Sequence, residues 1–345
     1  MTNHNHTRSI DRPIVVVGLG SIGRRHLQNL YALGQRRLIA VTRGTSPLPA
    51  DELPPHQTEE TLAAALKHDP IAVLVCNPTA LHLSTALEAA AAGCHLFLEK
   101  PVSHQLGGVE QLVAIAAEKN LLVQVGFQFR FHPVLGAIKE LLAKERLGRL
   151  VSVHVHWGEY LPAWHPWEDY RKGYSARSDL GGGVVLTLCH PFDYLRWMLG
   201  EIEGVYALTG HRSGLELDTE DTASVLLRFA SGLAGTVYLD YVERPRQHTL
   251  TLIGDRGKVQ WDNDTATALW YDAEEQSAHK IEPPVGFDRN DLFVGEIAHF
   301  MDSLSSGSQP SCRLEDGLRS LQIVEAVKES NKLRREVNPV ELGGV

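Results

Sequence analysis

Short apolar runs alternate with longer, alanine-rich segments over the first part of the chain, from residue 13 to about residue 128. A short apolar run is typical of a strand that is buried on both faces, whereas alanine-rich segments favour helices. Because a helical segment separates each strand from the next, the pattern predicts an α/β fold with a doubly wound parallel sheet. The predicted strands are residues 13–17, 38–42, 72–76, 95–98 and 122–125, and the predicted helices include residues 61–67, 83–92 and 112–119.

After about residue 131 the pattern changes to successive strands that are joined by short turns. Residues 150–160 alternate between apolar and polar, which predicts a strand with Val151, Val153, Val155 and Trp157 on one face. The turn Asp255-Arg256-Gly257 is suited to a hairpin, so this part of the chain is expected to form an antiparallel sheet. Further predicted strands are residues 205–209, 223–229, 233–241, 248–254 and 257–261, and further predicted helices are residues 134–144, 184–199, 291–303 and 315–331.

These patterns divide the chain into three parts. We expect a polar tail at residues 1–12, a first domain at residues 13–130 and a second domain at residues 131–345. One of the two late helices is able to return to the first domain and pack on it.

A glycine-rich turn follows the first predicted strand and opens a helix. Gly18, Gly20 and Gly23 have the spacing at which the first glycine permits a tight turn, the second lets the backbone approach a pyrophosphate, and the third lets helix and strand pack closely. Phosphates then lie at a helix N-terminus, where N–H groups and the helix dipole favour negative charge. The alternative is a flexible turn without a ligand, but the position between strand and helix favours dinucleotide binding in a Rossmann domain. The residues expected to bind it are Gly18, Gly20, Ser21, Ile22 and Gly23.

The end of the second predicted strand bears on the identity of the dinucleotide. In NAD-binding folds an acidic residue at this place accepts hydrogen bonds from the ribose 2′-OH. Here the position is occupied by Arg43, which follows Thr42. A guanidinium and a hydroxyl suit a 2′-phosphate, so we predict NADP as the cofactor, with NAD as the alternative.

Composition and charge narrow the class of protein. The net charge of −9 and the lack of a basic run argue against nucleic acid as a main partner. The polar N-terminus lacks the apolar core of a signal peptide, and no run approaches transmembrane length, so we expect a cytoplasmic protein without a membrane partner. The four cysteines lack metal-type spacing, and we expect reduced thiols and no metal site.

Several short motifs occur in an order that resembles one known family. Beyond the glycine turn and His26, these are Cys76-Asn77-Pro78-Thr79 with His82, Glu99-Lys100-Pro101, Gly181-Gly182-Gly183 with His190 and Asp193, and the ending Asp316-Gly317-Leu318-Arg319-Ser320-Leu321. Over nearly the whole chain they are similar to the glucose–fructose oxidoreductase, inositol dehydrogenase and MocA family.

This resemblance implies a Rossmann domain and an α/β domain with a large, mostly antiparallel open sheet that forms a homodimer or homotetramer interface. It implies reversible hydride transfer between a nicotinamide and a carbinol carbon of a sugar, sugar nucleotide or cyclitol. It also adds Asn77, Pro78, His82, Glu99 and Lys100 to the expected cofactor-binding residues, and a cis peptide before Pro101.

Two residues are expected to carry out the chemistry. A lysine ammonium at the end of a parallel strand can stabilise a developing alkoxide, which suits Lys100, although an isolated strand-end lysine is usually only solvated. An imidazole can take the hydroxyl proton and return it, which suits His190, although a histidine on an apolar helix is usually a core residue. Many family members carry an aspartate near this histidine, but the corresponding positions here are Leu186 and Thr187. Thr187, three residues before His190, would share its helical face and bond substrate without acting as a carboxylate.

The substrate is expected to meet an aromatic loop and several arginines. Trp164, Tyr170 and Arg171 lie in a loop rich in aromatic and polar residues, which suits a sugar face or a base, although Trp164 and Trp167 could equally cover the core. Arg130, Arg171 and Arg177 together could hold a carboxylate or diphosphate. Asp193 is a candidate for substrate contact or for orienting the His190 helix.

The sequence is consistent with two other functions. Since Thr187 replaces a carboxylate, the chain could be a cofactor-binding sugar sensor that does not catalyse. It could also be an enzyme that holds its cofactor tightly and recycles it within each turnover.

Overall fold

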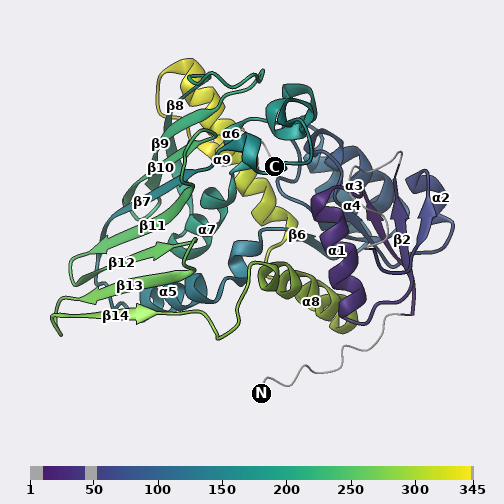
Figure 1. The fold of residues 1–345 in the computed structure, drawn as a ribbon, viewed down its shortest axis with the longest axis horizontal. Coiled ribbons are helices and arrows are strands. Elements are labelled where there is room, and N and C mark those ends of the chain that lie inside the picture. The colour runs from purple at the N-terminus through teal and green to yellow at the C-terminus, as the bar shows by residue number, and fades with distance from the viewer. Residues whose placement is uncertain (1–10, 43–52, 343–345) are drawn as a thin grey trace. The chain divides into compact units, whose positions relative to one another are not determined.

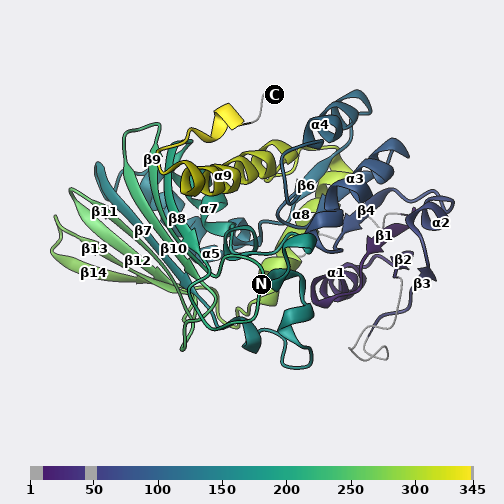
Figure 2. The same cartoon turned by 90° about the horizontal axis from the view of Figure 1, so that it is seen from above.

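The structure is a computed structural model that describes residues 11–42 and 53–342. The chain divides into two compact units. The first extends to Gln128 and includes Arg289–Leu318, and the second comprises Phe129–Asp288 and Arg319–Val345. Figure 1 and Figure 2 show the elements of both units from two directions.

A six-stranded sheet lies at the centre of the first unit, in the order β3-β2-β1-β4-β5-β6. All of its strand pairs are parallel. The two central strands, β1 and β4, are apolar and buried throughout, as strands that are covered on both faces must be. The doubly wound parallel sheet is therefore confirmed. Its strands are β1 (Ile14–Val17), β2 (Leu38–Val41), β3 (Gln57–Glu59), β4 (Ala72–Val75), β5 (His95–Leu98) and β6 (Val123–Val125).

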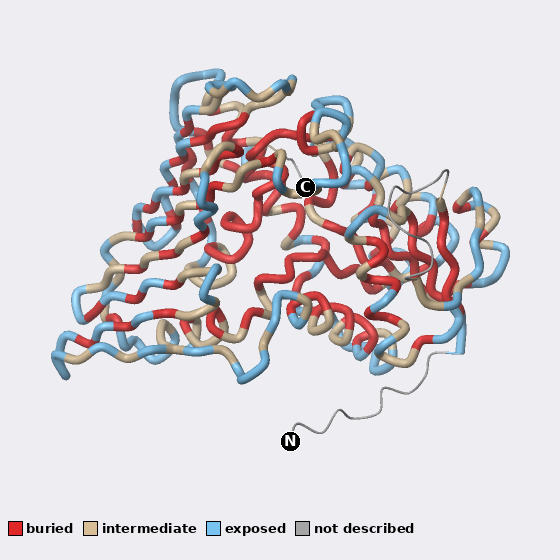
Figure 3. Tube along the Cα trace, in the orientation of Figure 1, coloured by how far each residue is buried: buried red, intermediate tan, exposed pale blue. Residues whose placement is uncertain are grey.

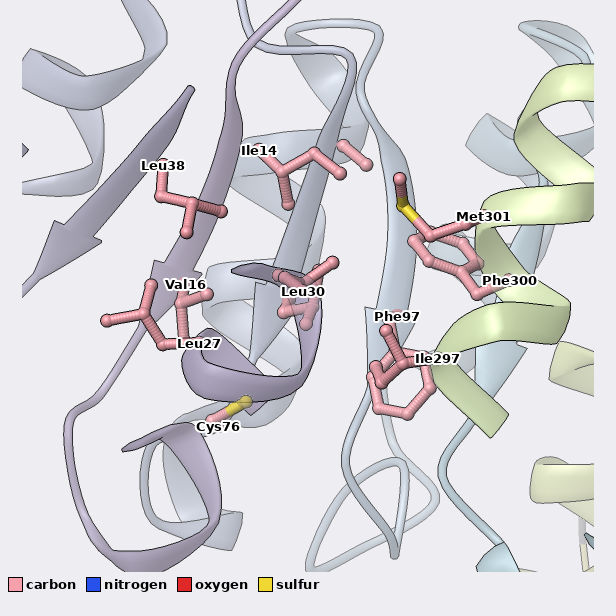
Figure 4. Close-up of a cluster of buried hydrophobic side chains, with 12 residues drawn as sticks. Ile14, Val16, Leu27, Leu30, Leu38, Cys76, Phe97, Ile297, Phe300 and Met301 are labelled. Atoms are coloured by element: carbon pink, nitrogen blue, oxygen red, sulfur yellow. The ribbon is translucent and has the colours of Figure 1, made fainter. Parts of the chain in front are cut away.

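Helices cover both faces of this sheet (Figure 2). The helices α1 (Ser21–Ala32) and α8 (Asn290–Ser306) lie side by side on one face, and α3 (His82–Ala91) and α4 (Val109–Glu118) lie on the other. The short α2 (Leu62–Leu66) begins at Thr61, whose side chain accepts a hydrogen bond from the Ala64 N–H. Apolar side chains of α1 and α8 meet the sheet in one core cluster (Figure 4), which includes Ile14, Val16, Leu27, Leu30, Phe97, Ile297, Phe300 and Met301.

An eight-stranded sheet forms the second unit, in the order β14-β13-β12-β11-β7-β10-β9-β8. The pair β7 and β10 is parallel and the other pairs are antiparallel, which confirms the mostly antiparallel sheet. Buried and exposed residues alternate along its strands (Figure 3). The strands are β7 (Leu150–Gly158), β8 (Ile202–Gly210), β9 (Thr222–Phe229), β10 (Ala234–Asp240), β11 (Gln247–Gly254), β12 (Gly257–Asp262), β13 (Thr267–Asp272) and β14 (Ser277–Ile281).

Helices cover only one face of this second sheet (Figure 2). They are α5 (Pro133–Ala143), α6 (Val184–Thr187), α7 (His190–Leu199) and the later part of α9 (Leu314–Leu333). In α9, Ser330 Oγ accepts a hydrogen bond from the Ala207 N–H, which ties the helix to β8. Single 3₁₀ turns occupy Thr79–Leu81, Gln128–Phe131, Leu161–Ala163, Tyr170–Lys172, Tyr174–Ala176, Ser178–Leu180 and Pro339–Leu342.

The sequence pattern misplaced one side chain and missed three strands. Val151 was expected on the buried face with Val153, but it is 57% exposed. The pairing of β7 with β11 shifts there, from Ile253 opposite Ser152 to Gly254 opposite Leu150, and such a bulge reverses the face of the extra residue. The strands that the pattern missed, β3, β13 and β14, all lie at or next to a sheet edge, where one-sided exposure weakens the apolar signal.

No helix within residues 11–42 and 53–342 combines the length and apolar character needed to span a bilayer.

Candidate active site

Three neighbouring strands of the first sheet end at the same edge and lead into the predicted motifs. β1, β4 and β5 are adjacent, and their carboxyl ends precede Gly18, Asn77 and Lys100. Ligands of open α/β sheets bind at this edge. The structure thus brings together the glycine turn, the Asn77-Pro78 segment and the Glu99-Lys100 segment within one unit.

The glycine turn combines tight backbone packing with one open position. Gly18 has φ +94°, and a Cβ there would lie 2.8 Å from the Asn77 backbone nitrogen. A Cβ on Gly23 would lie 1.9 Å from the Gly18 carbonyl oxygen, so both positions require glycine. A Cβ on Gly20, by contrast, would meet nothing within 4 Å.

The open position lies at the start of α1, where Gly20 and Ser21 are exposed and Ile22 is half-buried. No side chain caps this N-terminus. Backbone N–H groups at such a helix end bind anions, so the space beside Gly20 fits the phosphates of a dinucleotide. Thr42 is half-buried at the end of β2, and Arg43 lies outside the described residues.

The segment after β4 offers a hydrogen-bond acceptor that has no partner. The Asn77 amide nitrogen donates to Thr85 Oγ1 at 2.8 Å, while the buried Asn77 Oδ1 accepts no hydrogen bond from the described part of the chain. His82 has a different position, with its ring nitrogens 2.7 Å from the Pro101 oxygen and 2.8 Å from the Asn77 oxygen. Burial lowers the pKa of His82, and its hydrogen bonds to the two backbone oxygens raise it by smaller effects, so the side chain lies between the Asn77 and Pro101 backbones.

Glu99 and Lys100 lie where β5 ends. The Glu99 carboxylate is buried; its Oε1 is 2.7 Å from His26 Nε2, and its Oε2 accepts a hydrogen bond from the Lys100 N–H. Glu99 therefore connects α1, which begins at the glycine turn, to the Lys100 backbone. The Lys100 side chain is half-buried, and the Lys100–Pro101 peptide is cis.

In the second unit, the helix predicted at residues 184–199 is two helices. α6 ends at Thr187 and α7 begins at His190, with Pro191 in its first turn. A proline lacks an N–H and its ring collides with the carbonyl four residues earlier, here Thr187, so a continuous helix is excluded. The expectation that Thr187 and His190 share one helical face is wrong for this reason.

The glycine triplet before α6 serves backbone packing. Gly183 has φ +106°, and a Cβ there would lie 2.4 Å from a carboxylate oxygen of Glu220. The same Glu220 carboxylate accepts a hydrogen bond from the Val185 N–H at the start of α6. A Cβ on Gly182 would lie 2.3 Å from the Tyr174 oxygen. The triplet thus lets the chain before α6 pass close to neighbouring backbone.

His190 is buried among aromatic rings. Its ring centroid is 5.1 Å from Phe129 and 5.7 Å from Trp157, and Trp157 stacks on His248 at 4.0 Å. The Tyr194 hydroxyl is 3.2 Å from His248 Nε2. Burial lowers the pKa of His248 well below its usual value, so that imidazole is neutral and packs as an apolar ring.

Thr187 is also buried, and it lies beside a tyrosine that the sequence did not single out. Its side chain lies beside Tyr241, whose hydroxyl donates a hydrogen bond to the Ser175 oxygen at 3.4 Å. Burial raises the pKa of Tyr241 well above its usual value, so the phenol keeps its proton. The half-buried Trp164 ring packs edge-on against Tyr241 at 5.5 Å.

Each of the predicted substrate arginines is paired with a carboxylate. Arg130 binds Asp193 through two hydrogen bonds of 2.7 and 2.9 Å, and the two side chains are only 4% and 1% exposed. Arg171 pairs with Asp169 and Glu216 on the surface, and Arg177 pairs with Asp179. Tyr170 accepts a hydrogen bond from the Glu216 N–H. Each guanidinium already has a carboxylate, which gives no support to a shared anion site.

Two groups of one histidine and two carboxylates occur in the described parts of the chain, each with donor atoms within 4.8 Å of one another. They are His26, Glu99 and Glu296, and His156, Asp240 and Glu243. In each group a histidine Nε2 is within hydrogen-bond distance of a glutamate, at 2.7 and 2.5 Å respectively. Hydrogen bonding accounts for the proximity of the histidine and this glutamate in each group.

The family models match both parts of the chain. Residues 12–127 match the oxidoreductase family with an NAD-binding Rossmann fold, and residues 136–260 match the GFO/IDH/MocA C-terminal domain. Among curated relatives, myo-inositol 2-dehydrogenase of Thermotoga maritima is 28% identical, over 96% of this chain and 99% of its own. D-xylose 1-dehydrogenase (NADP(+)) 2 of Haloferax volcanii is 26% identical, over 81% of this chain and 84% of its own.

A solved structure agrees over the same extent. GenD2 from gentamicin A biosynthesis in complex with NAD has a TM-score of 0.81 and 26% identity, covering 98% of this chain and 99% of its own. The agreement therefore includes both units.

Proposed function

The chain belongs to the Gfo/Idh/MocA family of NAD-binding oxidoreductases, and we propose that it oxidises or reduces a carbinol carbon of a sugar, sugar nucleotide or cyclitol, with Lys100 and His190 as catalytic residues. The observation that carries this proposal is the edge formed by β1, β4 and β5. There the open start of α1, the partnerless Asn77 oxygen and the half-buried Lys100 occur at neighbouring strand ends.

The cofactor is held by groups that the structure leaves open to it. Gly20 and Ser21 would offer backbone N–H groups to the pyrophosphate, and Asn77 Oδ1 would accept a hydrogen bond from a ribose hydroxyl or the carboxamide. When bound, the nicotinamide accepts or returns the hydride. Thr42 and Arg43 would contact a 2′-phosphate, which favours NADP over NAD.

The preference for NADP has its own test. Fluorescence titration with both reduced cofactors is expected to give tighter binding of NADPH, and Arg43→Ala is expected to remove the difference. Tighter binding of NADH to the unaltered protein would refute the preference while leaving the oxidoreductase assignment intact.

Lys100 and His190 divide the proton chemistry between them. The Lys100 ammonium stabilises the negative charge that develops on the substrate oxygen. The His190 imidazole takes the hydroxyl proton during oxidation and returns it during reduction. Thr187, with its hydroxyl in contact with Tyr241, bonds the substrate and moves no proton. Apolar rings of Phe129 and Trp157 around His190 exclude water from the imidazole.

The catalytic assignment is tested with a panel of hexoses, cyclitols and sugar nucleotides, by following reduced nicotinamide at its absorbance band. Lys100→Ala and His190→Ala are expected to lower kcat by a hundredfold or more, while the dissociation constant for the dinucleotide stays close to that of the unaltered protein. Turnover that survives both substitutions would refute the roles assigned to these residues.

We further propose that the protein is a cytoplasmic homodimer or homotetramer. The open face of the second sheet exposes apolar side chains, and all four cysteines are buried thiols, which suits a reducing compartment. Leu226→Lys, on β9 next to the edge strand β8, is expected to lower the molar mass measured by light scattering. An unchanged mass would exclude this face as the interface. The apolar side chains are Val151, Tyr206, Leu208, Leu226, Leu269 and Tyr271.

A further inference from the structure

Glu296 is a carboxylate in the interior of the first unit that the proposed chemistry does not use. It lies on α8 and is 0% exposed, and neither of its carboxylate oxygens has a hydrogen-bond partner among residues 11–42 and 53–342. Its backbone oxygen accepts a hydrogen bond from the Gln124 side chain at 2.8 Å, which fixes this part of α8 against the sheet. An ionised carboxylate in such a place is strongly disfavoured unless hydrogen bonds or an opposite charge compensate it.

Hydrogen bonds connect the neighbours of Glu296 to the Lys100 backbone. A Glu296 carboxylate oxygen lies within 4.8 Å of a ring nitrogen of His26 and of a carboxylate oxygen of Glu99. His26 Nε2 and the Lys100 N–H together engage both oxygens of Glu99. Glu296 therefore lies beside the connection between the glycine-turn helix and the catalytic lysine.

The charges around Glu296 come from every element that packs against it. From the end of β5 come Glu99 and Lys100, from α1 come His26 and Arg25, and from the end of β4 comes Cys76. Burial and the neighbouring Glu99 raise the pKa of Glu296 well above its usual value, while Arg25 and Lys100 lower it by smaller effects.

The two carboxyl groups are not equivalent. Among the described residues, Glu99 has the His26 imidazole and the Lys100 N–H as hydrogen-bond partners, whereas the Glu296 carboxyl oxygens have none. Two adjacent buried carboxyls seldom both ionise, and the one without donors retains the proton.

We propose that Glu296 is held as the neutral acid and is a positioning residue for Lys100, acting through Glu99. The proposal rests on the proposed function only in taking Lys100 as catalytic. When Glu296 loses its proton, the new charge repels Glu99 and loosens its bonds to His26 and to the Lys100 N–H. The lysine then loses its fixed position at the strand end, and activity falls on the alkaline side.

The variant Glu296→Gln tests the protonation state because glutamine has the shape of the neutral acid. The matched control is Asp302→Asn, an exposed carboxylate on the same helix. A carboxyl whose folded-state pKa is raised contributes full stability below its unfolded pKa, and this contribution is lost as pH rises through the folded-state pKa. The Tm of Glu296→Gln relative to the unaltered protein is therefore expected to rise steadily from pH 5 to pH 9, and that of Asp302→Asn is not.

A second readout separates positioning from mere stability. The loss of kcat/KM between pH 7 and pH 9 is expected to be smaller in Glu296→Gln than in the unaltered protein, and the difference is expected in kcat. Lys100→Ala removes activity but leaves the pH dependence of the Tm difference in place. Failure of the proposed function and failure of this proposal are thus distinguishable.

Three results would overturn the proposal. One is a Tm of Glu296→Gln that falls below that of the unaltered protein as pH rises, which would show that Glu296 needs its charge. Another is a stoichiometric divalent cation in the purified protein that Glu296→Gln loses, which would show a bound metal in place of a proton. The third is failure of Glu296→Gln to fold, because a neutral isostere should replace a neutral acid.

Discussion

The His26 imidazole and the Glu99 carboxylate meet at 2.7 Å in the interior of the first unit, between the helix that follows the glycine turn and the strand that ends at Lys100. The His26 ring also packs edge-on against Phe97 and Phe293, at 5.0 and 6.2 Å. One buried contact thus joins the helix that follows the glycine turn to the carboxylate that binds the Lys100 N–H.

Removing His26 is therefore expected to affect both stability and the site. His26→Ala leaves the buried Glu99 carboxylate without its imidazole partner, and loss of one member of a buried pair costs about 3–5 kcal/mol. Urea denaturation is expected to show this loss in the free energy of unfolding, and the KM for the dinucleotide is expected to rise. An unchanged free energy of unfolding would contradict the link.

Gly20 and Gly23 are expected to separate cofactor binding from folding. Gly20→Ala adds a methyl group where nothing lies within 4 Å. The Tm is therefore expected to stay unchanged, while the dissociation constant for the dinucleotide is expected to rise. Gly23→Ala drives a methyl group into the Gly18 carbonyl oxygen, and both Tm and binding should fall. Thermal unfolding and fluorescence titration measure the two effects. Equal affinity of Gly20→Ala and the unaltered protein would place the phosphates elsewhere.

The pair Arg130 and Asp193 is expected to hold α7, which begins with His190, in place. Arg130→Ala leaves Asp193 buried and unpaired, at a cost of about 3–5 kcal/mol in the free energy of unfolding. Arg171→Ala, at an exposed ion pair, serves as the control and should leave stability nearly unchanged. If Arg130→Ala raised the substrate KM alone, with stability intact, Arg130 would be a substrate ligand after all.

Acid should weaken the second unit through His132. Burial lowers the pKa of His132 to about 4, from the ordinary value of 6.5. A histidine with a lowered folded-state pKa contributes stability above its unfolded pKa, and this is lost as pH falls towards the folded value. The difference of about 2.5 units corresponds to about 3 kcal/mol between pH 6.5 and pH 4.

The variant His132→Asn isolates this effect. Asparagine can still accept the hydrogen bond that His132 Nδ1 accepts from the Val134 N–H at the start of α5, but it does not titrate. The free energy of unfolding is expected to fall less steeply with acid in the variant. Identical slopes would show that His132 does not control the acid response.

The periodicity of the sequence was sufficient to predict the parallel sheet, because strands such as β1 and β4 are short apolar runs buried on both faces. It failed where the backbone departs from regular geometry. Val151 changes face at a bulge, and the segment from Val184 to Leu199 breaks at Pro191, features that an apolar pattern alone does not encode.

The candidate site was predictable only in part, for a related reason. Motif residues such as Gly18, Asn77 and Lys100 follow successive strands, so the carboxyl-end rule brings them together. Glu296 lies far along the chain on α8, where a glutamate in an amphipathic helix indicates a solvated position. Its burial beside Glu99 arises from the return of α8 to α1, which no local pattern specifies.

Isotopic labelling tests most directly whether the protein transfers a hydride from a carbinol carbon to the nicotinamide. Carbinol-deuterated hexoses and cyclitols are incubated with the protein and NADP⁺, and the reduced cofactor is analysed by mass spectrometry. Deuterium is expected in the cofactor with the unaltered protein, and none is expected with Lys100→Ala or His190→Ala. Dinucleotide that binds tightly but remains unlabelled across the whole panel would contradict the account and indicate a sensor.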